Sequence, residues 1–257
     1  MRTLLVAGSA LLGLLAGPLV SLVVIRVPRR QPLLGTSTTC PGCATTFEHP
    51  GGWLSAAIPR PALKCPGCGA SAGGRPRALG IACAALFAVA AWRFSDSWAL
   101  PAYLLLFGTL LAISVIDYQH HIVPNRILVP VVVVSLALLG GGSLADGVSF
   151  AFVRGVLGGA AAFGILLMMN LVSPQGLGMG DVKLAFLLGL YLGWLGWALV
   201  AVGLFLGFVL GGVGGLVLIL AGIRDRRDHI AFAPFLSAGA VLGVLFGTSL
   251  LSWYPAL

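Results

Sequence analysis

Acidic side chains are scarce in this chain of 257 residues. Charged residues make up 9% of it, and fifteen Lys and Arg face only seven Asp and Glu. A soluble domain carries about 25% charged residues, so the composition excludes a soluble globular protein. The scarcity also restricts the chemistry, because a reaction that needs a carboxylate must draw on seven residues: Glu48, Asp96, Asp117, Asp146, Asp181, Asp225 and Asp228.

Hydrophobic residues dominate instead, at 59% of the chain with a mean hydropathy of +1.05. A helix needs about 20 apolar residues to cross a bilayer. Apolar runs of roughly that length occupy 4–25, 78–94, 98–116, 127–141, 150–172, 184–197, 198–221 and 231–251. We therefore predict an all-α polytopic membrane protein with about eight transmembrane helices. The run 127–141 is short for a span, and we expect 184–221 to break between Gly193 and Gly196.

The stretch 26–77 differs from the rest, because it is rich in Pro, Gly, Thr, Cys and Arg and has no spanning run. We predict a first transmembrane helix at 1–25, a cytoplasmic insert at 26–77 and a membrane core of about seven helices at 78–257. The alternative for the first run is a cleavable signal peptide, since Arg2 precedes it. The run is long for that purpose, and no small-x-small cleavage site closes it.

Basic residues sort to one side of the predicted topology. With the insert in the cytoplasm, alternating spans place the loops 117–126, 173–183 and 223–230 on the same side. Only Arg2, Arg93 and Arg154 of the fifteen basic residues then fall on or near the far side, which leaves twelve in the cytoplasm. This is the asymmetry of the positive-inside rule. We assign the net charge of +8 to topology and to a lipid bilayer, and not to nucleic-acid binding.

Four of the five cysteines form two C-x-x-C pairs with 21 residues between them: Cys40, Cys43, Cys65 and Cys68. Four thiolates suit the tetrahedral geometry of a structural zinc ion, and the Pro-Gly inside each pair favours the turn that brings two sulfurs together. Such a site leaves no open coordination position, so we expect a structural metal. Iron is an alternative, while two redox pairs would need a thioredoxin-like fold. The fifth cysteine, Cys83, falls inside a span.

Two of the seven acids stand at the ends of predicted spans. Asp117 closes the run from Leu104 to Ile116, and Asp181 precedes the run that begins at Leu184. The other five fall in loops or in the insert, where water can solvate them. An ionisable group at a span is costly and marks function, so Asp117 and Asp181 are the candidate catalytic residues. The alternatives are snorkelling to water and, for Asp181, capping of a helix N-terminus.

Three glycines alternate just before Asp181, in the sequence GLGMG at 176–180. Such a segment does not hold a stable helix, and glycine lets another backbone approach closely. We expect Gly178 and Gly180 to form a loop that binds a substrate strand beside the carboxylate. Lys183 is either an anchor at the membrane interface or a contact for an acidic group of the substrate.

Five motifs together resemble the bacterial prepilin peptidases, which are membrane aspartyl proteases with a G-x-G-D signature. They are VIRVP at 24–28, the two C-x-x-C pairs, IDYQHHIVPN at 116–125, GMGD at 178–181 and APFLSAG at 233–239. The resemblance covers nearly the whole chain in the family's order. It implies that Asp117 and Asp181 are a catalytic pair in the bacterial inner membrane. This pair would cleave the N-terminal leader of type IV prepilin or pseudopilin precursors at the cytoplasmic face.

The resemblance also bears on a second activity. Family members of this longer form often methylate the new N-terminus with S-adenosylmethionine. Where the family has a Pro-x-x-Glu-like pattern, the segment 76–80 has no glutamate, and no acid occurs from 49 to 95. This departure leaves methyl transfer open and does not affect cleavage.

Two further functions compete with prepilin cleavage. A presenilin-type intramembrane protease shares the G-x-G-D motif but does not explain the cysteine pairs. A transporter or channel with a zinc docking module would use intramembrane acids and broken helices for ion coupling.

Overall fold

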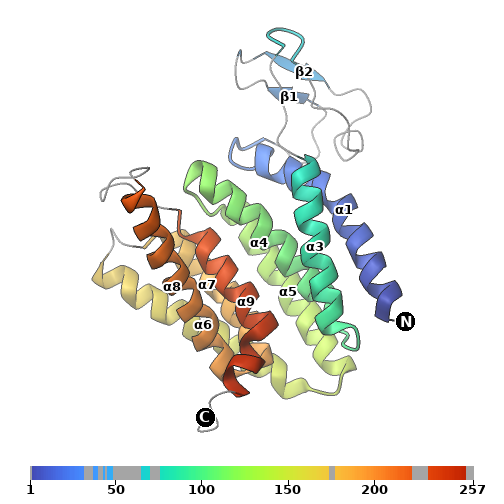
Figure 1. Ribbon diagram of the computed structural model, residues 1–257, viewed down its shortest axis with the longest axis vertical. Helices are drawn as coiled ribbons and strands as arrows, with labels where there is room; N and C mark the ends of the chain where they lie inside the picture. Colours follow the sequence, from blue (N-terminus) through green and yellow to red (C-terminus); the bar gives the residue numbers. More distant parts are fainter. Residues whose placement is uncertain are drawn as a thin grey trace. The chain divides into compact units, whose positions relative to one another are not determined.

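The computed structural model describes residues 2–31, 37–39, 43, 45–48, 65–69, 76–173, 177–221 and 231–252. In this part of the chain, eight helices and one short sheet follow one another (Figure 1). The order is α1 (Arg2–Arg26), β1 (Ser37–Thr39), β2 (Thr46–Glu48), α3 (Pro76–Phe94), α4 (Leu100–His120), α5 (Asn125–Ala145), α6 (Ser149–Val172), α7 (Met179–Leu195), α8 (Trp197–Leu220) and α9 (Ala233–Ser252). The predicted all-α class is confirmed.

Six of these helices are long and apolar enough to cross a membrane: α1, α3, α4, α5, α6 and α8. Helix α7 has 17 residues and α9 has 20. The predicted break of 184–221 is confirmed, because α7 ends at Leu195 and α8 begins at Trp197. The expectation of a short span at 127–141 was wrong. Helix α5 has 21 residues, because it extends beyond the apolar run through Gly142. That glycine packs against the backbone of Ala99, where a Cβ would lie 3.1 Å from the Ala99 nitrogen.

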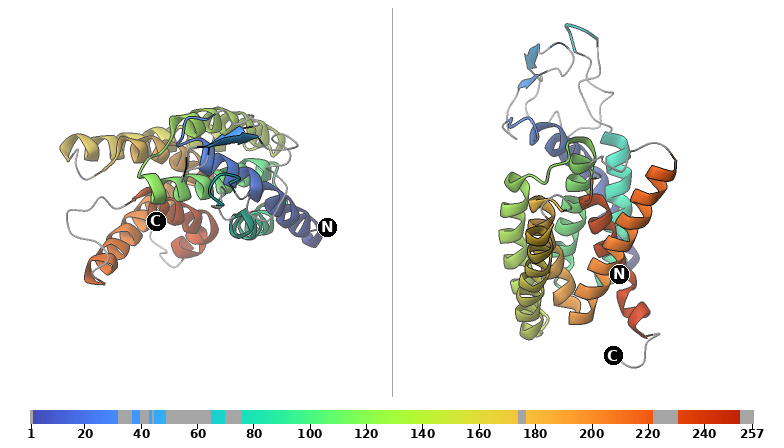
Figure 2. Two further views of the ribbon diagram at one scale, coloured as in Figure 1. Left: turned by 90° about the horizontal axis from the view of Figure 1, so that it is seen from above. Right: turned by 90° about the vertical axis from the view of Figure 1, so that its left-hand side faces the viewer.

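The chain divides into two compact units, and α4 contributes residues to both. The first unit contains Met1–Asp96 and Leu104–Ala112. In it, α1 and α3 lie side by side and antiparallel (Figure 2). Gly13 faces Ala84 and Gly17 faces Gly80 at distances that leave no room for a Cβ. Close approach of this kind at small residues is how helices associate in membranes.

The second unit contains Ser97–Tyr103 and Ile113–Leu257, and α7 is its most buried helix. All residues from Leu187 to Trp194 are buried. Glycines of α6 make this close packing possible, because a Cβ on Gly158 would lie 2.8 Å from the carbonyl oxygen of Gly189. A helix that is apolar on all sides belongs in the interior of a bundle. The packing of the short, central α7 therefore determines where the residues at its two ends lie.

Helices α8 and α9 also pack closely at glycine residues. A Cβ on Gly239 of α9 would lie 2.2 Å from the backbone nitrogen of Gly207 of α8. Gly211 packs against the ring of Phe232. Gly207 and Gly211 lie at small-x-x-x-small spacing, and Gly207 allows the backbones of α8 and α9 to approach closely.

Buried polar side chains fix α7 against its neighbours. The Tyr103 hydroxyl of α4 donates to the carbonyl oxygen of Tyr191 at 3.1 Å. The Tyr191 hydroxyl donates to the carbonyl oxygen of Ala102 at 2.9 Å and lies 2.8 Å from Oγ of Ser135 on α5. At the C-terminal end of α7, Arg154 of α6 donates to the carbonyl oxygens of Gly193 and Trp194. These contacts satisfy groups that lipid could not, and they fix the position of α7 along its axis.

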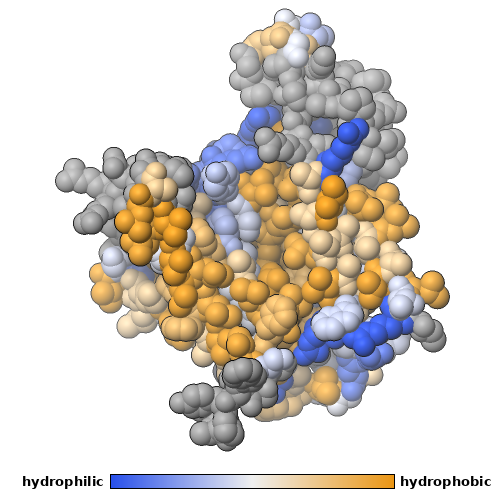
Figure 3. All heavy atoms as spheres, in the orientation of Figure 1, coloured by the Kyte–Doolittle hydropathy of each residue, from blue (hydrophilic) through white to orange (hydrophobic). Residues whose placement is uncertain are grey.

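Hydrophobic side chains cover the outward faces of several helices. Figure 3 shows them over α3 and α8. On α8 the exposed hydrophobic residues include Phe205, Val209, Val213, Leu216 and Val217. Contiguous apolar surface of this extent suits contact with lipid chains and does not suit contact with water.

We predict that Gly158→Ala lowers the thermal unfolding temperature of the protein in detergent. The added methyl would lie 2.8 Å from the Gly189 oxygen and 2.9 Å from the Gly193 Cα, so α6 and α7 must separate. Overpacking of this kind costs about 1–3 kcal/mol. Gly164→Ala is the matched control, because no atom lies within 4 Å of its added Cβ. Equal unfolding temperatures for the two variants would contradict the packing assigned to α6 and α7.

Candidate active site and metal centre

Asp117 lies in the last turn of α4 and is buried, with 5% of its surface exposed. Its Oδ2 accepts a hydrogen bond of 3.1 Å from the backbone N–H of Ala233, the first residue of α9. The first N–H groups of a helix have no partner within that helix. The Asp117 carboxylate therefore caps α9 from a neighbouring helix.

Asp181 lies in the first turn of α7 and is also buried, with 8% of its surface exposed. Its carboxylate makes a hydrogen bond with the backbone of Gly178, the residue that precedes α7, and interacts electrostatically with Asp117. A side chain that reaches back from the first turn to the N-cap resembles half of a capping box. The structure thus brings the two candidate catalytic residues together at one end of the second unit.

The glycine segment is more helical than the sequence predicted. Helix α7 begins at Met179, so Gly180 belongs to its first turn, while Gly178 has an extended conformation. The expected start near Leu184 was wrong, because burial of α7 and the contact from Asp181 to Gly178 outweigh the low helix propensity of glycine. The N-cap residue is Gly178, not Asp181.

The two predicted loop glycines have different surroundings. A Cβ on Gly180 would lie 2.8 Å from Cβ of Val123, which belongs to the loop between α4 and α5. The lack of a side chain at Gly180 therefore allows Val123 of the same protein, and not a substrate, to pack closely against this turn. Gly178 is exposed, and a Cβ there would lie 3.3 Å from Oδ2 of Asp181. Of the two, Gly178 offers the free surface beside the carboxylate.

Lys183 is partly exposed, and its Nζ donates to Oδ1 of Asn125 at 3.2 Å. Asn125 is the first residue of α5. Lys183 thus lies near the membrane end that holds both aspartates, beside the same loop that contacts Gly180. His121 of that loop has a left-handed conformation with φ 54°, and its side chain interacts electrostatically with Asp117.

Two contributors to the site could not be identified as such from the sequence. The first is the backbone N–H of Ala233, since the motif around it indicated no role for that group. The second is Asn170 of α6, which donates to the carbonyl oxygen of Leu177 and so fixes the segment that leads into α7. The APF motif at 233–235 was the one available signal, because proline in the first turn marks a helix start.

The remaining acids divide into bonded and solvated groups. Asp146 accepts hydrogen bonds from the Ser97 hydroxyl (2.6 Å) and the Trp98 N–H (3.1 Å), so it is a structural cap and more than the solvated loop residue that we expected. Asp96 is exposed and accepts a hydrogen bond from Ser95. Asp225 and Asp228 lie outside the described residues.

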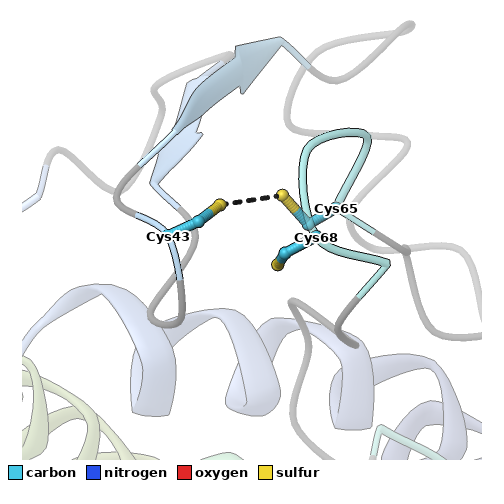
Figure 4. Close-up of side chains that lie close together, drawn as sticks. All are labelled: Cys43, Cys65 and Cys68. Atoms are coloured by element: carbon cyan, nitrogen blue, oxygen red, sulfur yellow. Dashed lines mark hydrogen bonds between the residues drawn. The ribbon is translucent and has the colours of Figure 1, made fainter.

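Three cysteines cluster in the first unit. Cys43 lies between β1 and β2, which pair antiparallel, and Cys65 and Cys68 lie on the turn at 65–69. Figure 4 shows the three sulfur-bearing side chains gathered between these two loops. Their sulfur atoms lie within 4.8 Å of one another, and those of Cys43 and Cys65 are 3.5 Å apart. Cys40, the fourth predicted ligand, lies outside the described residues. The buried Cys83 lies in α3, apart from the cluster.

The chemistry of this cluster fits a metal ion. Tetrahedral coordination with metal–sulfur bonds of about 2.3 Å requires sulfur atoms about 3.8 Å apart, close to the separations found here. Hydrogen bonds with the Thr45 hydroxyl, which lies 3.1 Å from the Cys43 sulfur, with the Thr45 backbone and with Cys65 lower the pKa of the Cys43 thiol to about 6. The thiolate is the form that binds metal. The backbone N–H of Gly67 points at the Cys65 sulfur at 3.4 Å, as expected for the Pro-Gly turn.

Comparison with known proteins gives a consistent result. Residues 104–247 match the sequence model of the Type IV leader peptidase family, and this segment contains both Asp117 and Asp181. A prepilin leader peptidase/N-methyltransferase of Bacillus subtilis is 29% identical over 249 residues, which cover 94% of this chain and 94% of the relative. Proteins of the same name are 31% identical in Stutzerimonas stutzeri (74% of this chain, 65% of the relative) and 27% identical in Pseudomonas aeruginosa (95% and 91%). No solved structure matches this chain.

Proposed function

Because the chain belongs to the type IV leader peptidase family, we propose that it is a membrane aspartic endopeptidase with Asp117 and Asp181 as its catalytic pair. The observation that carries the proposal is the meeting of two buried carboxylates from α4 and α7 at one end of the second unit. The substrates that we propose are the N-terminal segments of type IV prepilin or pseudopilin precursors. The names of the relatives favour this function over a presenilin-type protease or a transporter.

Two adjacent carboxylates in a site of low dielectric constant do not ionise together cheaply, so the pair shares one proton. The ionised carboxylate takes a proton from water, and the resulting hydroxyl oxygen bonds to the scissile carbonyl carbon. The protonated carboxylic acid gives its proton to the carbonyl oxygen. As the tetrahedral intermediate collapses, the C–N bond breaks and the amine nitrogen takes up a proton from the pair. The roles of base and acid belong to the pair and not to one residue.

The location of the site fits this substrate. Both aspartates lie at helix ends, in a chain whose described part has six helices long and apolar enough to cross a membrane. We propose that this end faces the cytoplasm at a bacterial inner membrane, where the basic loops lie under the positive-inside rule. The exposed Gly178 would there receive an extended segment of the precursor beside Asp181.

Methyl transfer appears in the names of the relatives but not in our proposal. The glutamate expected in the family pattern is absent from 76–80, which form the start of α3, and no acid occurs from 49 to 95. The residues present therefore do not provide the carboxylate that transfer with S-adenosylmethionine would be expected to use. We restrict the proposed function to peptide hydrolysis.

Asp117→Asn and Asp181→Asn are each expected to reduce cleavage of a prepilin peptide by about 10²-fold or more, because an amide cannot take up the proton. The measurement is product mass against time with purified protein in detergent. Asp96→Asn is the matched control, since Asp96 is exposed and outside the pair. If either site variant still cleaves the peptide at an unchanged thermal unfolding temperature, the two aspartates are not the catalytic pair.

We also propose that Cys43, Cys65 and Cys68, with Cys40, bind one structural zinc ion. Purified protein is expected to contain one zinc atom per chain, and Cys43→Ser or Cys68→Ser to lose it, because three thiolates hold zinc less tightly than four. Elemental analysis by mass spectrometry gives the ratio. Cys83→Ala should retain the metal, since Cys83 is buried in α3 away from the cluster. Iron in place of zinc, or an unchanged zinc content in the Cys43 variant, contradicts the assignment.

For Lys183 we propose contact with an acidic group of the precursor. Lys183→Met is expected to raise KM several-fold and leave kcat unchanged, because the lost interaction is equal in the bound substrate and the transition state. Replacing the acidic residues of the peptide by their amides should make the wild type and the variant equivalent, as a double-mutant cycle requires. A KM that does not change in Lys183→Met would assign this residue to the membrane interface alone.

A further inference from the structure

Ser237 has an unusual position for a hydroxyl group. It lies on α9 with 4% of its surface exposed, and its Oγ has no hydrogen-bond partner in the part of the chain that the structure describes. Burial of an unpaired hydroxyl is unfavourable. Two other serines of this unit, Ser135 and Ser143, are equally buried, but each is bonded to an aromatic side chain, at 2.8 Å and 2.7 Å.

Helix geometry places Ser237 one turn along α9 from the residue that contacts Asp117. Ala233, whose N–H donates to Asp117, lies four residues earlier on the same helix. Residues at i and i+4 share one face, about 6 Å apart along the axis. Side chains of a helix lean toward its N-terminus, so the Ser237 hydroxyl covers the turn that holds Ala233. The face toward α8 is a different one, formed by Leu236 and Gly239.

A second buried polar atom at the same end also has no partner. Oδ1 of Asp181 makes no hydrogen bond within the described residues, although Asp181 is 8% exposed. Asp181 in turn interacts with Asp117, which is held by Ala233. The two unsatisfied oxygens thus belong to α7 and α9, the two helices whose first turns interact with Asp117. A water molecule needs two to four polar partners to occupy a buried site, and these groups provide them.

We propose that Ser237 is a third polar group of the active site and holds the attacking water together with the aspartate pair. This inference rests on the proposed protease function. The water donates one hydrogen to the ionised carboxylate and the other to Oγ of Ser237. Its lone pair is then directed at the scissile carbonyl carbon, and the proton that leaves the water passes to the carboxylate as in the unaided reaction. Ser237 itself gains and loses no proton.

The test uses Ser237→Ala in the full-length protein in detergent, with a prepilin peptide as substrate. We expect kcat to fall about tenfold or more with KM unchanged, because water in the wrong orientation slows the chemical step and not peptide binding. The thermal unfolding temperature should stay the same or rise, since the variant removes an unpaired buried hydroxyl. Ser237→Thr keeps the hydroxyl and should retain most of the wild-type kcat.

Ser143→Ala is the control, because that hydroxyl is bonded to the Trp194 side chain near the C-terminal end of α7, while Asp181 lies in its first turn. It should lower the unfolding temperature and leave kcat unchanged. A wild-type kcat in Ser237→Ala overturns the proposal, and so does a joint loss of kcat and thermal stability, which would indicate a packing role. If the wild type itself does not cleave, the protease function fails and this inference fails with it.

Discussion

The complete burial of α7 from Leu187 to Trp194 is the constraint on which the second unit depends. A helix with two such turns must be approached closely by its neighbours on every side. Glycines of α6 meet that need on one side. Tyr103, Ser135 and Arg154 then fix α7 along its axis by bonding to Tyr191 and to its last carbonyl groups. Because these contacts fix the helix at several levels, the position of its first turn is determined, and with it the position of Asp181.

That position creates an electrostatic conflict which the proposed chemistry uses. Both carboxylates lie at helix N-termini, Asp181 at that of α7 and Asp117 at that of α9, where unpaired N–H groups favour negative charge. Burial and mutual repulsion oppose charge on both at once. One negative charge and one shared proton satisfy the two demands together. A pair in this condition has the acid and the base that peptide hydrolysis requires, without a further titratable group.

The sequence predicted the helices well because the spans are long apolar runs separated by breaks such as Gly196. It also selected Asp117 and Asp181 as candidates, since carboxylates at span ends are rare, and the structure brings these two together. It failed where tertiary contacts outweigh local preference. Glycine propensity argued against a helix at Gly180, yet α7 begins at Met179. The hydrogen bond from Ala233 to Asp117 could not be predicted, because its donor is a backbone N–H group, which no side-chain pattern indicates. The contact between Gly180 and Val123 joins the first turn of α7 to a loop that is distant in sequence, so no local pattern predicts it.

Position at a helix end does not by itself separate a catalytic acid from a structural one. Asp146, Asp117 and Asp181 all interact with backbone groups at the starts of helices α4, α9 and α7. Asp146 differs because both of its oxygens accept hydrogen bonds, one from Trp98 and one from Ser97. Each oxygen of this carboxylate already has a partner in the protein. Asp181 keeps one buried oxygen unpaired within the described chain and interacts with a second carboxylate. An unpaired buried oxygen is unfavourable for folding, and the proposed hydrolysis gives this one a partner in the attacking water.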